Sequence, residues 1–95
     1  MNYKKMVMST KTKQKLPKWF NGELYARGET VTNPFSGESF ELTAVELAIY
    51  DFIMGCNVVF ASAPKRVNDK MIKDFDRALT WFRVNNPEAY MALLD

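Results

Sequence analysis

The hydrophobic and polar positions of this chain follow a helical period most clearly between residues 68 and 86. At about 100° per residue, five apolar side chains fall within about 60° on either side of Phe75. They are Met71, Ile72, Ala78, Leu79 and Phe82. Charged and polar side chains occupy most of the remaining positions. The pattern predicts an amphipathic surface helix that begins at Asn68 or Asp69 and ends at Asn85-Asn86.

A second apolar segment, residues 44–54, contains only two polar residues, Glu46 and Asp51. Its start has the sequence of a capping box. The Thr43 side chain accepts a hydrogen bond from the Glu46 backbone N–H, while the Glu46 side chain accepts one from the Thr43 backbone N–H. The chain therefore predicts a helix that begins directly after Thr43.

Two end points are compatible with this helix. Gly55 either terminates it as a left-handed cap or lies inside a longer helix that runs to about Ala63, where Pro64 stops it. We favour the longer helix, with a kink. Farther along, Asn-Pro-Glu at residues 86–88 combines an N-cap, a proline at the first helical position and an acid in the first turn. This combination predicts a short C-terminal helix.

Before residue 43 the chain alternates between short strand-like runs and turn residues. The candidate strands are "ELYAR" (23–27), "ETVT" (29–32) and "ESFEL" (38–42). The turn "NPFSG" joins the last two, because Asn-Pro opens turns and Gly37 adopts a positive φ without strain. We therefore predict a helix-dominated α+β fold, in which a short β-hairpin or three-strand meander precedes about three helices.

The N-terminal residues differ in composition from the rest. Residues 1–20 contain six lysines and no acid, a formal charge of +6, whereas residues 21–95 contain seven basic and eleven acidic groups, a charge of −4. We expect residues 1–18 to form a flexible basic arm and residues 19–95 a single small domain. Trp19 and Phe20 are expected to dock on that domain.

The side chains available for catalysis or metal binding are few. The chain has no histidine, and Cys56 is its single cysteine. The usual general base, the usual zinc ligand and the usual partner of a catalytic thiolate are therefore missing. We expect no enzymatic activity, no metal and no cofactor, and we interpret Cys56 as a small buried or half-buried apolar residue.

Two further candidate sites have simpler interpretations. "NPFSGES" precedes a helix but lacks the spacing and the lysine of a phosphate-binding loop, so we interpret it as a hairpin turn. The acidic residues of this region could form a carboxylate pair, but we interpret them as solvated. They are Glu38, Glu41, Glu46 and Asp51. Glu46 and Asp51 lie about 140° apart on a helix and do not share one face.

The basic arm offers two interpretations. Its lysines could contact nucleic-acid phosphates, and Tyr3, Trp19 and Phe20 could stack on bases. The lysines are Lys4, Lys5, Lys11, Lys13, Lys15 and Lys18. Because the arm lacks arginine and the remaining chain is acidic, we favour a solvated or partner-binding tail and keep nucleic-acid binding as the alternative.

The apolar helix 44–54 has more apolar side chains than a domain of this size covers, so we expect part of it to contact another chain. Tyr50 and Ile53 are candidate interface residues. Trp81 is a third, because it lies about 120° from the centre of the apolar stripe of its own helix. These residues suggest a homodimer.

Two stretches resemble known proteins: "NPFSGESFELTAVELAIYDFIMGC" and "ALTWFRVNNPEAYMALLD". They are similar to short uncharacterised proteins of tailed bacteriophages that infect marine cyanobacteria and related hosts. The resemblance covers roughly residues 30–95 and implies a phage product in the cytoplasm of an infected bacterium or in the virion. No activity transfers with it. Glu46, Asp51 and Asn57 interrupt the most apolar window, 44–63, so we expect no membrane span. The apolar run at residues 6–8 is too short for a signal peptide, so we expect no secretion. The expected function is protein–protein interaction as a small accessory protein.

Overall fold

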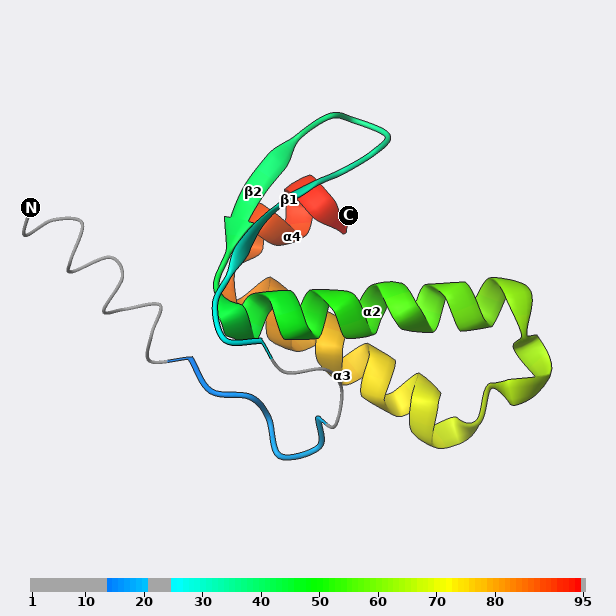
Figure 1. The fold of residues 1–95 in the computed structure, drawn as a ribbon. Helices are drawn as coiled ribbons and strands as arrows, with labels where there is room; N and C mark the ends of the chain where they lie inside the picture. Colours follow the sequence, from blue (N-terminus) through cyan, green and yellow to red (C-terminus); the bar gives the residue numbers. More distant parts are fainter. Residues whose placement is uncertain (1–13, 21–24, 95) are drawn as a thin grey trace, which may run out of the picture.

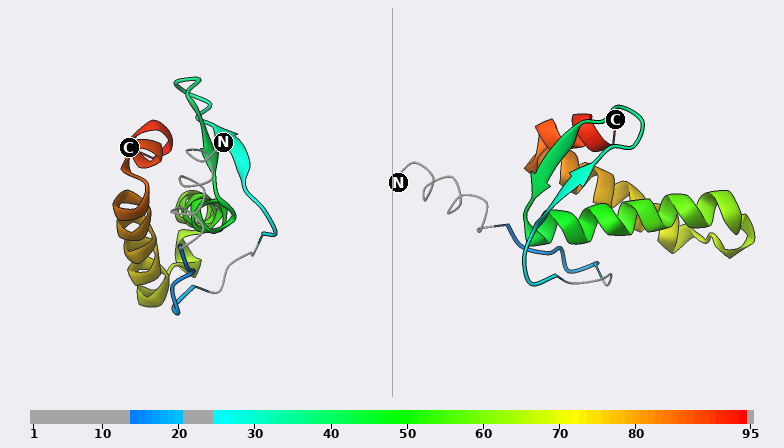
Figure 2. Two further views of the ribbon diagram at one scale, coloured as in Figure 1. Left: turned by 90° about the vertical axis from the view of Figure 1, so that its left-hand side faces the viewer. Right: turned by 45° about the horizontal axis from the view of Figure 1, so that its top comes forward.

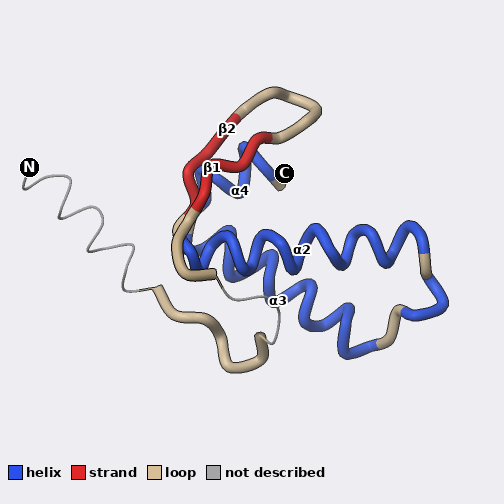
Figure 3. The backbone as a smooth tube through the Cα atoms, in the orientation of Figure 1, coloured by secondary structure: helices blue, strands red, loops and turns tan. Residues whose placement is uncertain are grey.

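The fold combines one β-hairpin with three helices and a short 3₁₀ turn. The computed structural model describes residues 14–20 and 25–94. Its elements are β1 (Glu29–Thr32), β2 (Ser39–Leu42), α2 (Ala44–Ser62), η1 (Pro64–Arg66), α3 (Asp69–Asn85) and α4 (Pro87–Leu93). Figure 1 shows α2 and α3 side by side, with the hairpin and α4 at one end and η1 at the other. The tube in Figure 3 shows the small share of strand. The predicted helix-dominated α+β fold is confirmed.

The hairpin forms where the turn residues predict it. β1 and β2 are antiparallel, with Val31 opposite Phe40. The Asn33 side chain accepts hydrogen bonds from the backbone N–H groups of Phe35 and Ser36, and Gly37 has φ 81°. The Asn33 amide also donates to the Ala92 carbonyl oxygen at 3.0 Å. Asn33 therefore shapes the turn and fixes the hairpin to α4.

The predicted strand "ELYAR" does not form in the part of the chain that the structure describes. Residues 23 and 24 lie outside the described residues, and residues 25–27 are not in a strand. Tyr25 instead donates a hydrogen bond to Asp51 on α2. Gly28 follows, and its Cα lies so close to β2 that a Cβ would meet the Leu42 carbonyl oxygen at 1.8 Å. The close approach leaves space only for glycine.

The capping box at the start of α2 is confirmed. Thr43 Oγ1 accepts from the Glu46 N–H at 3.1 Å, and Glu46 Oε1 accepts from the Thr43 N–H at 2.9 Å. The helix continues through Gly55 to Ser62, so the longer of the two predicted helices is present. The described part of the chain has one helix long and apolar enough to cross a membrane, and this is α2.

Packing around α2 explains its apolar composition. The left view of Figure 2 looks nearly along this helix and shows α3 on one side, the hairpin on another and residues 14–20 on a third. Ile49 and Ile53 on α2 and Phe82 on α3 are at most 1% exposed and form the centre of the core. The second half of α2 extends beyond the hairpin and residues 14–20 but still packs against α3, where the ring centroids of Phe60 and Phe75 are 5.0 Å apart. Much of the apolar excess that suggested an interface is therefore covered within the single chain.

Glu46 corrects one expectation. Its side chain is 0% exposed, whereas the sequence suggested a solvated carboxylate. Besides the Thr43 N–H, its oxygens accept hydrogen bonds from Gln14 Nε2 at 2.8 Å and Asn86 Nδ2 at 3.1 Å. Three donors from three segments, together with the positive end of the α2 dipole, replace water around this carboxylate.

The two remaining helices begin at the predicted caps. Asn68 accepts from the Met71 N–H at the start of α3, and Asn86 accepts from the Ala89 N–H at the start of α4. Because Asn86 also donates to Glu46, its side chain caps α4 and joins that helix to the start of α2.

Candidate functional site

The candidate site is a groove between residues 14–20 and α3, which we call the tryptophan groove. It has a volume of about 520 Å³. Its lining residues are Pro17, Trp19, Lys73, Asp76, Arg77, Thr80 and Trp81. The two tryptophans are the only ones in the chain, and both lie here. The groove therefore brings together two aromatic residues that are far apart in the sequence.

The wall that carries Trp19 is held by contacts at several points. Trp19, Phe20 and Phe52 of α2 form an aromatic cluster with ring centroids 5.8–6.1 Å apart. The Phe20 N–H donates to the Pro17 carbonyl oxygen at 3.1 Å and closes a turn. At the start of the segment, the Gln14 amide bonds to Glu46. The predicted docking of Trp19 and Phe20 is confirmed.

The opposite wall is the outer face of α3. Trp81 is half-buried, with its ring 6.3 Å from that of Phe82 in an edge-on arrangement. Arg77 lies one turn before Trp81 on α3, and Lys73 lies one turn before Arg77. The three side chains share one face of the helix, because they are four residues apart. The sequence pattern that marked Trp81 as lying outside the apolar stripe therefore identified one wall of the groove.

The charges along this face are mostly basic. Asp74 is 5% exposed and accepts from Lys70 Nζ at 2.6 Å, and Arg77 Nη1 lies 3.7 Å from its other oxygen. These are the two ion pairs of the described residues. Lys73 is exposed and takes part in neither of them. The groove thus has one cation partly engaged by Asp74, a second one, Lys73, outside the ion pairs, and the carboxylate of Asp76.

Four of the six predicted nucleic-acid contacts, Lys4, Lys5, Lys11 and Lys13, lie outside the described residues. Lys15 and Lys18 are exposed on the segment that forms the Trp19 wall. Within the predicted arm of residues 1–18, the chain contacts the domain from Gln14 onward: Gln14 is hydrogen-bonded and Leu16 packs against the core. The lysine-rich segment therefore leads directly into the groove.

Two of the three predicted interface residues are buried in the core. Ile53 is 1% exposed and Tyr50 is 8% exposed, because α3 and the hairpin cover them. Ile53 presents almost no surface to another chain in this fold, and the small exposed part of Tyr50 lines the groove between the hairpin and α2. Trp81 is half-buried and lines the groove instead.

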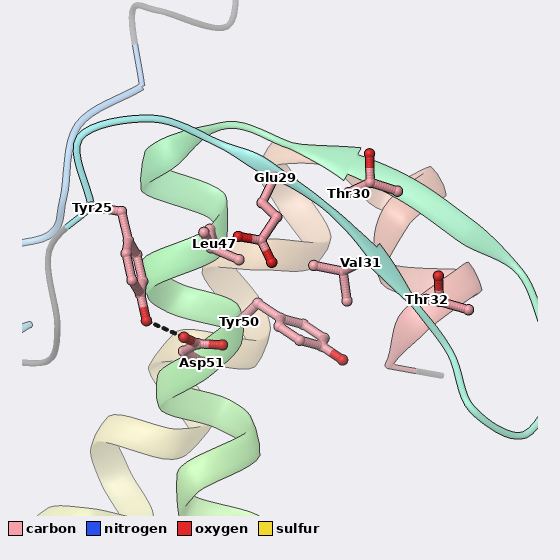
Figure 4. Close-up of a pocket in the computed structure, with 8 residues that line it drawn as sticks. All are labelled: Tyr25, Glu29, Thr30, Val31, Thr32, Leu47, Tyr50 and Asp51. Atoms are coloured by element: carbon pink, nitrogen blue, oxygen red, sulfur yellow. Dashed lines mark hydrogen bonds between the residues drawn. The ribbon is translucent and has the colours of Figure 1, made fainter.

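A second groove lies between the hairpin and α2. It has a volume of about 430 Å³, and Figure 4 shows its lining: Tyr25, Glu29, Thr30, Val31, Thr32, Leu47, Tyr50 and Asp51. Glu29 and Val31 point toward α2, and the Tyr25 hydroxyl donates to Asp51. Burial raises the pKa of Tyr50, and the negative charge of Asp51 adds to this effect. Among the described residues that line this groove there is no lysine or arginine.

The described residues contain no group of three or more His, Cys, Asp or Glu side chains placed to hold a metal ion. Cys56 is 4% exposed, and burial, with a smaller contribution from the charge of Asp74, raises the pKa of its thiol. A raised pKa keeps the thiol protonated and unreactive at neutral pH.

No protein-family model, no curated protein and no solved structure matches this chain. The composition and geometry of the two grooves therefore provide the basis for any functional proposal.

Proposed function

We propose that this protein is a non-enzymatic nucleic-acid-binding protein that uses the lysine-rich N-terminal segment and the tryptophan groove together. The observation that carries the proposal is that Trp19 and Trp81 line one groove from different segments, together with the cations of Lys73 and Arg77 on the α3 wall. Aromatic side chains combined with a basic groove are the usual elements of sequence-tolerant binding to single strands, and lysines supply phosphate contacts to any strand.

The charge distribution supports the same function. The six lysines of residues 1–20 are not accompanied by a single acid, and residues 14–20 form one wall of the groove. Of these lysines, Lys15 and Lys18 are exposed on that wall, so they add positive charge beside the aromatic residues. Binding of a polyanion to these cations releases counterions, so the affinity is expected to fall steeply as the salt concentration rises.

Fluorescence anisotropy of a labelled mixed-sequence oligonucleotide tests this proposal at several salt concentrations. We expect binding that weakens linearly on a log–log plot of affinity against salt. Lys73→Gln should reduce the steepness of that line by about 1, while Lys65→Gln, an equal charge change on η1 outside the groove, should not. Absence of binding at low salt, or equal effects of the two variants, would contradict the proposal.

Protein interaction, the function expected from the sequence, is the second candidate. Met54 and Val58 on α2 are 37% and 63% exposed, and Ile72 on α3 is 46% exposed. At about 100° per residue, Met54 and Val58 lie on the same side of α2 as Leu47, which the hairpin covers farther toward the start of the helix. We propose this apolar surface as the contact for a second copy of the chain. Either function is compatible with an accessory protein inside an infected bacterial cell, which the word-level resemblance implies.

A further inference from the structure

We infer that the tryptophan groove binds unpaired nucleobases, so that the ligand is a single strand and not a duplex. This inference rests on the proposed function and specifies its substrate class. It starts from the composition of the groove, which is lined by the rings of Trp19, Trp81 and Pro17 and by two cations on the α3 wall.

Phosphate contacts involve the cations of the groove and leave the aromatic rings of the two tryptophans without a role. A duplex keeps the faces of its bases stacked inside and offers a protein its phosphates and the base edges in its grooves. A single strand exposes the faces of its bases, and every base has a face that stacks on an indole. The two half-buried tryptophans are therefore matched to a base and not to a phosphate.

The two walls are rigid enough to act as stacking platforms. Trp19 is packed against Phe20 and Phe52, with centroid distances of 6.1 and 6.0 Å, and its segment is fixed at Gln14. Trp81 is part of a helix of 17 residues and contacts Phe82. Because neither side chain needs to be ordered on binding, the loss of side-chain entropy is small.

The cations and the carboxylate suggest how a strand would lie. Lys73 and Arg77 are on one face of α3, one turn apart, as successive phosphates of an extended strand require. Asp76 lies about 100° away from Arg77 on the same helix and repels phosphates from that edge. The backbone of the strand is therefore expected along Lys73 and Arg77, with a base directed toward Trp81.

The intrinsic fluorescence of the full chain tests this inference, because both tryptophans of the protein line this groove. Four probes are compared at one low salt concentration: a short oligothymidylate, a duplex of the same length, heparin and poly-glutamate. We expect the oligothymidylate to quench the tryptophan emission and to bind more tightly than the duplex. Heparin, a polyanion without bases, should bind without comparable quenching.

Variants separate stacking from charge. Trp81→Leu should weaken oligothymidylate binding by about 5- to 150-fold and leave heparin binding unchanged, while Trp81→Phe should restore part of the loss. Phe35→Ala is the matched control, because Phe35 is 98% exposed on the hairpin turn and outside the groove. Trp19→Leu provides a second variant if Trp81→Leu does not fold, and quenching of the wild-type chain needs no variant.

The outcomes distinguish the two levels of the proposal. Equal affinity for duplex, heparin and oligothymidylate without quenching would overturn the single-strand inference and leave the proposed nucleic-acid function standing. Absence of binding to every nucleic acid would overturn both. Quenching by poly-glutamate equal to that by oligothymidylate would also overturn the inference and would assign the groove to an acidic protein segment.

Discussion

Replacing Glu46 by alanine should destabilise the protein more than replacing any exposed glutamate. The side chain is 0% exposed, and its two oxygens accept hydrogen bonds from Thr43, Gln14 and Asn86 at 2.8–3.1 Å. None of these donors belongs to a lysine or arginine. The Glu46→Ala variant therefore leaves three polar groups without their acceptor, and the donor on Asn86 lies in a buried residue.

The size of the effect follows from these contacts. A hydrogen bond to a charged acceptor contributes about 1.5–3 kcal/mol, but three bonds to one carboxylate are not additive. The variant also no longer desolvates a charge, which offsets part of the loss. We therefore expect the free energy of unfolding to fall by about 2–4 kcal/mol, a large share of the roughly 5–15 kcal/mol typical of a small domain.

Urea unfolding followed by far-UV circular dichroism measures this change through the midpoint and the slope. Glu41→Ala is the matched control, because Glu41 is exposed on β2, and its change should stay within about 0.5 kcal/mol. Thr43→Ala should cost about 0.5–2 kcal/mol as a lost N-cap. If Glu46→Ala lowers stability no more than Glu41→Ala does, the buried network does not stabilise the fold and the reasoning is wrong.

Three further predictions concern other parts of the molecule. Gly28→Ala should unfold the protein or lower its melting temperature strongly, because the added Cβ would overlap the backbone of β2. Gly55→Ala should instead raise stability by about 0.5–1 kcal/mol in the same thermal scan, because this glycine lies inside α2 with open space around it. The pKa values of Tyr50 and Cys56 are raised in the folded protein above their usual values of 10.0 and 9.0. The unfolded chain therefore loses these protons first, and the urea midpoint should fall as pH rises above those usual values. The double variant Tyr50→Phe/Cys56→Ala should reduce this fall. Sedimentation equilibrium at micromolar concentration should show a species heavier than 11.0 kDa that Val58→Lys returns to 11.0 kDa, and a wild-type mass of 11.0 kDa would end the self-association proposal.

The sequence predicted those features that depend on neighbouring residues. The capping box at Thr43, the N-caps at Asn68 and Asn86 and the positive φ of Gly37 each involve residues within a few positions of one another. Their geometry is local, so the residue types suffice to indicate it. The hairpin and the order of the helices followed from these signals.

The features that the sequence did not predict depend on residues far apart in the chain. Glu46 looked solvated because its partners Gln14 and Asn86 are 32 and 40 residues away, and no local pattern indicates them. Ile53 looked like an interface residue because its coverage comes from α3. The tryptophan groove joins residues 19 and 81, and only Trp81, by its place outside the apolar stripe, gave a signal.

The long-range contacts also connect stability to the proposed function. The Gln14 amide N–H donates to Glu46, which caps α2, and the Gln14 Oε1 accepts from the Thr43 hydroxyl at 2.8 Å. The same residue begins the segment that carries Trp19 to the groove. Loss of the Glu46 carboxylate therefore removes one of the contacts that hold the segment carrying Trp19. Because a stacking platform must be held in position to bind without an entropic cost, Glu46 should contribute to ligand affinity although it lies outside the groove.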